Sequence, residues 1–218
     1  MYKRQIEKLG DKADFEAKYG VKDKGVLMFA AGDGNHSLAT AKTCWEEIKK
    51  ELSEEEIKTH PARFALVELM NIHDETLEFE PIQRVIFETE PKKLLDELVA
   101  FYGAEYEDNG GQRIDYTYGG NEGSIYIKNT DSNLPVGTLQ KFLDKYLTEN
   151  GGKIDYIHGN DVVRNLAKAD NTIGFMVDSM EKNDLFTTVI KDGSLPRKTF
   201  SMGEAADKRF YLECQKIR

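Results

Sequence analysis

A turn of small and polar residues between two apolar segments holds the side chains of this sequence best suited to chemistry. Gly32, Asp33, Gly34, Asn35 and His36 follow the apolar run "VLMFAA" and precede a segment with helical periodicity. Such a turn at a helix start presents backbone N–H groups at the positive end of the helix dipole, and its glycines let a ligand approach the backbone closely. The arrangement favours anions, phosphate above all, with His36 available to donate to an oxyanion or to transfer a proton.

The same residues also fit a purely structural interpretation. Gly32 and Gly34 would form a tight turn, while Asn35 or Ser37 caps the following helix. Asp33 opposes anion binding unless a metal ion or a sugar hydroxyl meets its carboxylate. Because the Gly-Asp-Gly spacing matches neither GxGxxG nor a P-loop, spacing alone leaves both interpretations open.

The elements that must position this turn are predicted from the hydropathy pattern. Val26–Ala31 is typical of a short buried strand, and apolar residues then recur at helical spacing over Asn35–Leu52. A second strand is expected over Phe64–Met70. The segment "LEFEPIQRVIF" predicts another, placed at a sheet edge because Pro81 interrupts it.

The remainder of the chain alternates between helical and extended patterns. Helices are predicted in "PKKLLDELVAFYG", "LPVGTLQKFLDKYLTENGG", "NDVVRNLAKA" and "NDLFTTVIKDG". Strands are predicted in the hairpin "RIDYTYGGNEGSIYIKN" and in "KIDYIHG", "TIGFMVDSM" and "RFYLECQKI". Together these elements predict an α+β (mixed α/β) fold, a mixed sheet with flanking helices. We expect a single domain over residues 6–218, with any subdivision near residues 105–135.

Composition narrows the classes of function. A net charge of −9 and a pI near 5.1 argue against general nucleic-acid binding, because phosphate neutralisation needs clustered Lys and Arg. No apolar run reaches the roughly 18 residues of a membrane helix, so no membrane partner is expected. Cys44 and Cys214 stand outside any CxxC spacing, which favours free thiols and a cytoplasmic location. The four histidines form neither an HxH nor an HExxH pair, so no metal site is predicted.

The turn also carries a family resemblance. The segment "AAGDGNHSLATAK" resembles the Ala-Asp-Gly-His-His-Arg signature of the bacterial and archaeal family labelled domain of unknown function 1015, especially its clostridial-type members. Similar segments follow in the family's order: "HPARFALVELMNIHDETLEFEPIQRVI", "IDYIHG", "GFMVDSM" and "LPRKTFSMGEAADKRFYLE". The resemblance covers the chain from about Gly25 onward. Family members extend upstream of the motif and "MYKRQ" resembles translated adaptor sequence, so we expect residues 1–5 to be non-native and an upstream portion to be missing.

The family motif is in turn similar to the loop of the ParB/sulfiredoxin-like fold, in which a strand, a turn and a helix N-terminus hold a nucleotide phosphate. Asp33, Gly34 and His36 match that loop. Asn35 replaces its first histidine, and Ser37 stands where a phosphate-binding arginine is expected. Without that guanidinium, we expect affinity for a triphosphate either to drop or to depend on another cation. The candidate cations elsewhere in the chain are Lys42, Arg63, Arg84, Arg197 and Lys198.

Two further polar residues belong to the predicted site. Glu80 is a second candidate carboxylate, although it also fits a structural ion pair with Arg84. His158 directly precedes another predicted helix start, in "YIHGND", where it would lie near the positive end of that helix.

Two classes of function follow from the resemblance and the turn. The first is an enzyme of small-molecule phosphate chemistry, a nucleotide-dependent kinase or hydrolase using a nucleotide with Mg²⁺. Its catalytic residues would be His36 with Asp33 or Glu80 as metal partner or base. The second is a non-catalytic ligand-binding or regulatory domain. Convergence of Asp33, His36 and a second carboxylate in one pocket would distinguish the enzyme.

Overall fold

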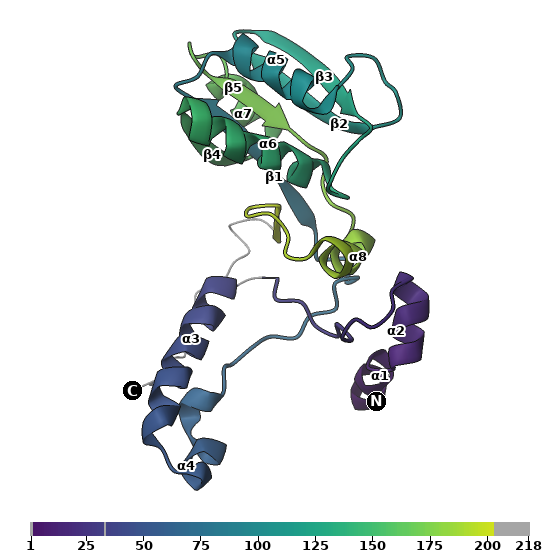
Figure 1. Ribbon diagram of the computed structural model, residues 1–218, viewed down its shortest axis with the longest axis vertical. Coiled ribbons are helices and arrows are strands. Elements are labelled where there is room, and N and C mark those ends of the chain that lie inside the picture. The colour runs from purple at the N-terminus through teal and green to yellow at the C-terminus, as the bar shows by residue number, and fades with distance from the viewer. Residues whose placement is uncertain (1, 33, 203–218) are drawn as a thin grey trace. The chain divides into compact units, whose positions relative to one another are not determined.

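The computed structural model describes residues 2–32 and 34–202, and Figure 1 shows the elements along the chain. The chain divides into two compact units, of which the first runs to Leu77 and the second begins at Glu78. Among the described residues, no helix combines the length and the apolar character needed to cross a membrane.

The first unit is built from short helices. Their bounds are α1 (Tyr2–Leu9), α2 (Lys12–Tyr19), α3 (Asn35–Ile48), the 3-10 turn η1 (Lys49–Glu51), α4 (Glu54–Thr59) and the 3-10 turn η2 (Pro61–Arg63). The helix predicted over Asn35–Leu52 is confirmed as α3 and η1. A capping box begins α4: the Ser53 hydroxyl accepts from the Glu56 N–H, and the Glu56 carboxylate accepts from the Ser53 N–H.

Both strands predicted for the first unit are wrong. Val26–Ala31 and Phe64–Met70 have no regular secondary structure, and the strand pairings of the described residues include neither segment. Their large apolar side chains therefore remain accessible, with Phe29 51% and Leu66 87% exposed. Strand propensity alone does not make a strand, because its hydrogen bonds must come from a neighbouring strand.

The second unit contains the sheet and four helices. The strands are β1 (Phe79–Phe87), β2 (Gln112–Tyr118), β3 (Asn121–Ile127), β4 (Lys153–His158), β5 (Ile173–Met176) and β6 (Phe200–Met202). The helices are α5 (Pro91–Tyr102), α6 (Pro135–Asn150), α7 (Asn160–Leu166) and α8 (Lys182–Asp192). The four helices, the hairpin and the strands at β4 and β5 were predicted and are confirmed. The strand predicted in "RFYLECQKI" lies outside the described residues.

The sheet has the order β3-β2-β5-β1-β4, with β6 paired to the first residues of β1. Every described pairing is antiparallel, which corrects the predicted mixed sheet, although the α+β class is confirmed. Residue patterns identify strands but not the direction of their neighbours. The edge placement of β1 is also wrong, because Ile82–Phe87 pairs with β4 and part of it also with β5. Pro81 precedes this segment, so its missing N–H does not interrupt the central ladder.

Successive residues of β1 point to opposite faces of the sheet. Val85 packs with Val163 of α7, whereas Arg84 reaches Gln140 of α6. The α7 face is tightly packed, since a Cβ on Gly174 of β5 would lie 2.4 Å from Val163 Cγ1. Figure 1 shows α5 and α6 together over the sheet. The arginine at position 84 therefore lies inside the layer between β1 and α6.

Candidate functional site

The N-terminus of α3 begins at a glycine in the left-handed conformation. Gly34 is the N-cap residue, with φ 72°, and α3 continues for 14 residues. A Cβ built on Gly34 would meet no atom of the described residues within 4 Å, apart from its chain neighbours and helix backbone. Gly34 also has no side chain to accept from the first N–H groups, and the first turn contains no acidic residue. This helix end therefore combines a positive dipole with a glycine Cα that no non-neighbouring described atom crowds.

Three polar side chains lie at this helix end. Asn35, His36 and Ser37 are all exposed in the first turn of α3. Gly32 precedes them without regular secondary structure. Asp33 lies outside the described residues, so its role stays a prediction.

Two of the predicted phosphate-binding cations, Lys42 and Arg63, belong to the first unit, and both are exposed. Lys42 lies further along α3. Arg63 Nη1 donates to the backbone oxygen of Lys58 at 3.1 Å, and the guanidinium lies 5.7 Å from the centroid of the Phe64 ring. The contacts that the structure describes therefore place Arg63 at the end of α4.

Three of the predicted site residues belong to the second unit and make no described contact with one another. Glu80 is half-buried on β1 opposite Ser201, and His158 is exposed at the end of β4 opposite Ile82. Lys198 is exposed with φ 55°. No described hydrogen bond or ion pair joins any two of Glu80, His158 and Lys198.

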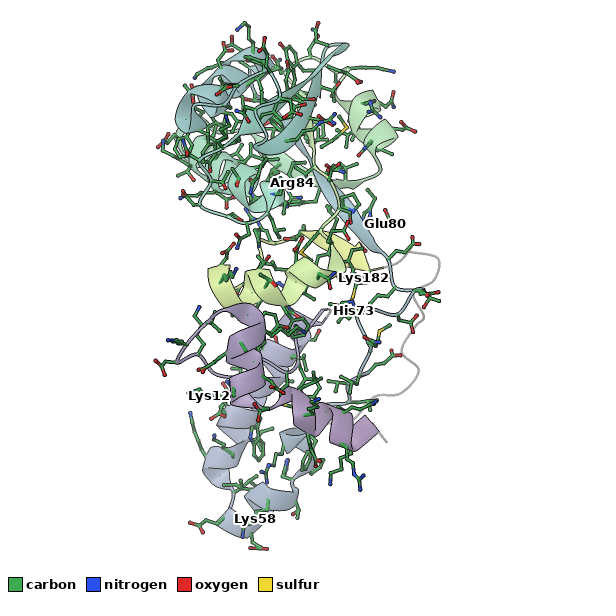
Figure 2. The ribbon with its side chains drawn as sticks, turned by 90° about the vertical axis from the view of Figure 1, so that its right-hand side faces the viewer. Lys12, Lys58, His73, Glu80, Arg84 and Lys182 are labelled. Carbon is green, nitrogen blue, oxygen red and sulfur yellow. The ribbon has the colours of Figure 1, made fainter. Side chains whose placement is uncertain are left out.

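The predicted ion pair between Glu80 and Arg84 does not form in the described structure. Four residues of extended strand separate their Cα atoms by about 13 Å, too far for a direct contact along one strand. Figure 2 shows both residues on β1, with Arg84 further into the sheet.

Arg84 is instead fully buried and donates to neutral acceptors. Its Nε donates to Gln140 Oε1 at 3.2 Å, its Nη1 to the backbone oxygen of Ile82, and its Nη2 to the backbone oxygen of Arg197 at 3.1 Å. Two of the predicted phosphate-binding cations, Arg84 and Arg197, are thus in direct contact.

Tyr156 lies between these two arginines. Its ring centroid is 5.3 Å from the guanidinium carbon of Arg84 and 5.9 Å from that of Arg197. Its hydroxyl is buried beside the Arg197 guanidinium, and no described residue accepts the hydroxyl proton. Asp144 Oδ1 accepts from Arg197 Nη2 at 2.9 Å and from Gln140 Nε2 at 2.8 Å. We call these five residues, Arg84, Gln140, Asp144, Tyr156 and Arg197, the arginine–tyrosine cluster.

The electrostatics of the arginine–tyrosine cluster follow from burial. Removal from water lowers the pKa of Arg84 to about 10, and the like charge of Arg197 contributes to the decrease. The pKa of Arg197 is raised, first by Tyr156 and then by Asp144. Both guanidinium groups therefore remain charged at neutral pH, opposite a single carboxylate.

Sequence reasoning identified the two arginines of the cluster and missed its other three members. Gln140 and Asp144 are one turn apart on α6, and Tyr156 stands in the strand "KIDYIH". No local motif marks these residues, because their role depends on the pairing of β1 with β4 and on the placement of α6.

Two hollows in the surface of the second unit contain none of the predicted site residues. One, of about 440 Å³, is lined by Glu88, Thr89, Glu90, Lys93, Tyr146, Asn150 and Asn171. The other, of about 300 Å³, lies between α5 and α6. Within the described ranges, no group of three or more His, Cys, Asp and Glu residues is arranged to hold a metal ion.

Comparison with solved structures finds one with a similar fold over most of the chain. SbnI with C-terminal truncation from Staphylococcus aureus matches with a TM-score of 0.52 and 12% sequence identity over 92% of this chain and 75% of that chain. A free serine kinase mutant in complex with ADP gives a TM-score of 0.45 and 14% identity over 62% of this chain. A conserved hypothetical protein from Pyrococcus furiosus gives 0.46 and 16% over the same share. The matched part spans 57% of the kinase and 59% of the Pyrococcus protein.

The family follows from a sequence match. The model described as "Protein of unknown function (DUF1015)" matches residues 4–176, and the chain belongs to this family. The predicted family is therefore confirmed, over residues 4–176, whereas the resemblance was expected from about Gly25 onward. No curated protein matches the chain.

Proposed function

We propose that the protein binds a phosphate-containing small molecule at the N-terminus of α3. The observation that carries this proposal is Gly34, which has a left-handed backbone at the start of a 14-residue helix, and beside whose Cα no non-neighbouring atom of the described residues would meet a Cβ within 4 Å. No side chain of the described residues blocks the approach of a phosphate group to Gly34, and both the N–H groups and the helix dipole favour its negative charge.

The polar residues of the first turn supply the remaining contacts of the proposal. The N–H groups of Asn35, His36 and Ser37 would donate to phosphate oxygens, and the exposed His36 imidazole and Ser37 hydroxyl would add side-chain donors. Lys42 and Arg63 are the first-unit cations that could replace the arginine missing at position 37. A nucleotide is the proposed ligand, because the resemblance to the ParB/sulfiredoxin-like loop implies one, and the turn with α3 would be the part of that fold present here.

The geometry supports binding more directly than catalysis. Kinase or hydrolase chemistry with Mg²⁺ would also require a carboxylate beside the bound phosphate, the role predicted for Asp33 or Glu80. The ligand-binding or regulatory function requires only the helix end. A cytoplasmic location belongs to the same proposal, since nucleotides are abundant there and Cys44 is a free thiol.

A pair of glycine variants tests the proposal. Gly34 and Gly20 both have left-handed backbones, with φ 72° and φ 64°, and a Cβ on either meets no described neighbour within 4 Å. Gly34→Ala and Gly20→Ala should therefore introduce similar backbone strain, but only Gly34→Ala places a methyl group at the proposed site. Melting temperatures are measured with ADP, ATP and AMP, each with and without Mg²⁺.

We expect a nucleotide to stabilise the wild-type chain and Gly20→Ala equally, and Gly34→Ala much less. A ligand at a hundred times its Kd adds about 2.7 kcal/mol to the free energy of unfolding. The proposal is wrong if no nucleotide raises the melting temperature, or if Gly34→Ala responds as strongly as Gly20→Ala.

A further inference from the structure

We infer that the second unit has an oxyanion site of its own, in which Arg197 and Tyr156 bind a carboxylate or phosphate group under the positive charge of Arg84. This inference goes beyond the proposed nucleotide site, since it uses no residue of the first unit. Three features of the arginine–tyrosine cluster support it: its charge, a buried hydroxyl whose proton has no described acceptor, and the accessibility of Arg197.

The first feature is an uncompensated positive charge. The described contacts of the cluster contain two guanidinium groups and one carboxylate, that of Asp144, which accepts from Arg197 and from neutral Gln140. Arg84 is fully buried, yet its three described hydrogen bonds go to neutral oxygens. Buried charges in proteins are ordinarily paired, so the cluster has the capacity for one further anion.

The second feature is the Tyr156 hydroxyl. It is buried, and the guanidinium of Arg197 beside it can donate but cannot accept, so no described residue accepts the hydroxyl proton. Such groups are rare in folded proteins, because a buried donor that loses water and gains no acceptor is unfavourable. An oxygen atom of a bound anion would accept the hydroxyl proton beside two cationic groups.

The third feature is the position of Arg197 at the surface. Its side chain is 64% exposed, and its described ion pair with Asp144 is itself accessible to solvent. Exposed pairs of this kind hold weakly, so the guanidinium can turn from Asp144 to an incoming anion at little cost. Because the guanidinium is a planar fork of N–H donors, it suits both carboxylate and phosphate oxygens.

Arg84 acts through the other two residues. Its fully buried guanidinium is a positioning group, which holds the backbone of Arg197 through that residue's carbonyl oxygen and adds charge from beneath the ring. A purely structural role, in which Arg84 fastens the turn around Arg197 to the sheet, would account for this hydrogen bond. It would not account for the buried Tyr156 hydroxyl, whose proton no described residue accepts.

The test uses inorganic phosphate and acetate as separate probes on the complete chain, each compared with chloride at equal ionic strength. Tyr156→Phe removes only the hydroxyl and keeps the ring between the arginines. Arg197→Gln removes the exposed charge. Arg113→Gln is the matched control, since Arg113 is also an exposed arginine of the second unit paired with one carboxylate, Asp115. Kd is measured by calorimetry, and melting temperature with and without each anion.

We expect phosphate, acetate or both to bind the wild-type chain and Arg113→Gln with equal Kd, and at least tenfold more weakly to Tyr156→Phe and Arg197→Gln. Without anion, Tyr156→Phe should melt no lower than wild type, because the buried hydroxyl that it removes has no described acceptor for its proton. Binding of phosphate alone assigns a phosphate group, and binding of acetate assigns a carboxylate.

The inference is overturned if neither anion binds beyond chloride, or if Tyr156→Phe and Arg197→Gln bind as tightly as wild type. Phosphate binding that is lost in Gly34→Ala and retained in Tyr156→Phe would also overturn it, while supporting the site at α3. Conversely, if no nucleotide stabilises the wild-type chain, the proposed site at α3 is wrong. The anion measurements on the arginine–tyrosine cluster still stand in that case, so each proposal can fail without the other.

Discussion

Arg84 and Tyr156 are directly paired across β1 and β4, and the guanidinium carbon of the fully buried arginine lies 5.3 Å from the centroid of the tyrosine ring. A cation over an aromatic face is stabilised by about 0.5–2 kcal/mol, the upper value applying where water is excluded. The pair thus stabilises an edge strand of the sheet and places positive charge beneath the turn that carries Arg197.

Replacing the buried arginine should strongly destabilise the second unit. Arg84→Ala would leave Gln140 and two backbone oxygens without their donor and would open a cavity under Tyr156. We expect the free energy of unfolding to fall by about 3–5 kcal/mol. Arg113→Ala, at an exposed ion pair, should cost no more than about 1 kcal/mol. Urea denaturation of both variants checks this, and equal effects would show that the arginine–tyrosine cluster does not stabilise the sheet.

A methyl group between β5 and α7 should be poorly tolerated. A Cβ on Gly174 would lie 2.4 Å from Val163 Cγ1, so Gly174→Ala should cost about 1–3 kcal/mol through overpacking. Val163→Ala removes the clashing methyl group, so the double variant should be more stable than the sum of the two single changes predicts. Strict additivity of the three unfolding free energies would contradict this packing.

The cap of α4 should weaken in acid. Hydrogen bonds from the Ser53 hydroxyl and then from the Ser53 N–H lower the pKa of Glu56 below its usual value of 4.5. A carboxyl with a lowered pKa in the folded state stabilises that state above its unfolded pKa, and the contribution disappears as the pH falls through the folded pKa. Amide exchange of Ser53 should therefore accelerate below about pH 4.5, beyond the intrinsic change of rate with pH.

Glu55→Ala serves as the control for this pH dependence. Glu55 pairs with Lys58 at 2.9 Å and takes no part in the cap. We expect Glu55→Ala to keep the acid-dependent exchange at Ser53 and Glu56→Ala to lose it. If both variants behave like wild type, the capping box does not protect the helix start.

Helices could be predicted from this sequence because their hydrogen bonds are local. The apolar periodicity over Asn35–Leu52 sufficed for α3 and η1, and Gly103 after "PKKLLDELVAFY" marked the end of α5. The strands depended on more than local pattern. Val26–Ala31 and Phe64–Met70 have the composition of strands, but neither is paired in the described structure.

The two candidate sites differ in the same way: one is formed by neighbours in sequence and the other by distant segments. The turn at Gly34 was evident because glycine spacing and helix start are neighbours in sequence. The arginine–tyrosine cluster was not, because Arg84, Tyr156 and Arg197 meet only through the pairing of β1 with β4 and the return of the chain after α8. The positive charge of the two arginines made them candidates. The chain has 10 tyrosines, and no local pattern distinguishes Tyr156 from the rest.

The central claim, that phosphate binds at the N-terminus of α3, is tested most directly by a nuclear magnetic resonance titration with ADP in the presence of Mg²⁺. We predict that the backbone amide signals of Asn35, His36 and Ser37 shift together along one saturating curve, because their N–H groups donate to phosphate oxygens. Gly20→Ala should reproduce that curve, and Gly34→Ala should lose it. Amide signals that stay unchanged at Asn35, His36 and Ser37 up to saturating ADP would contradict the claim.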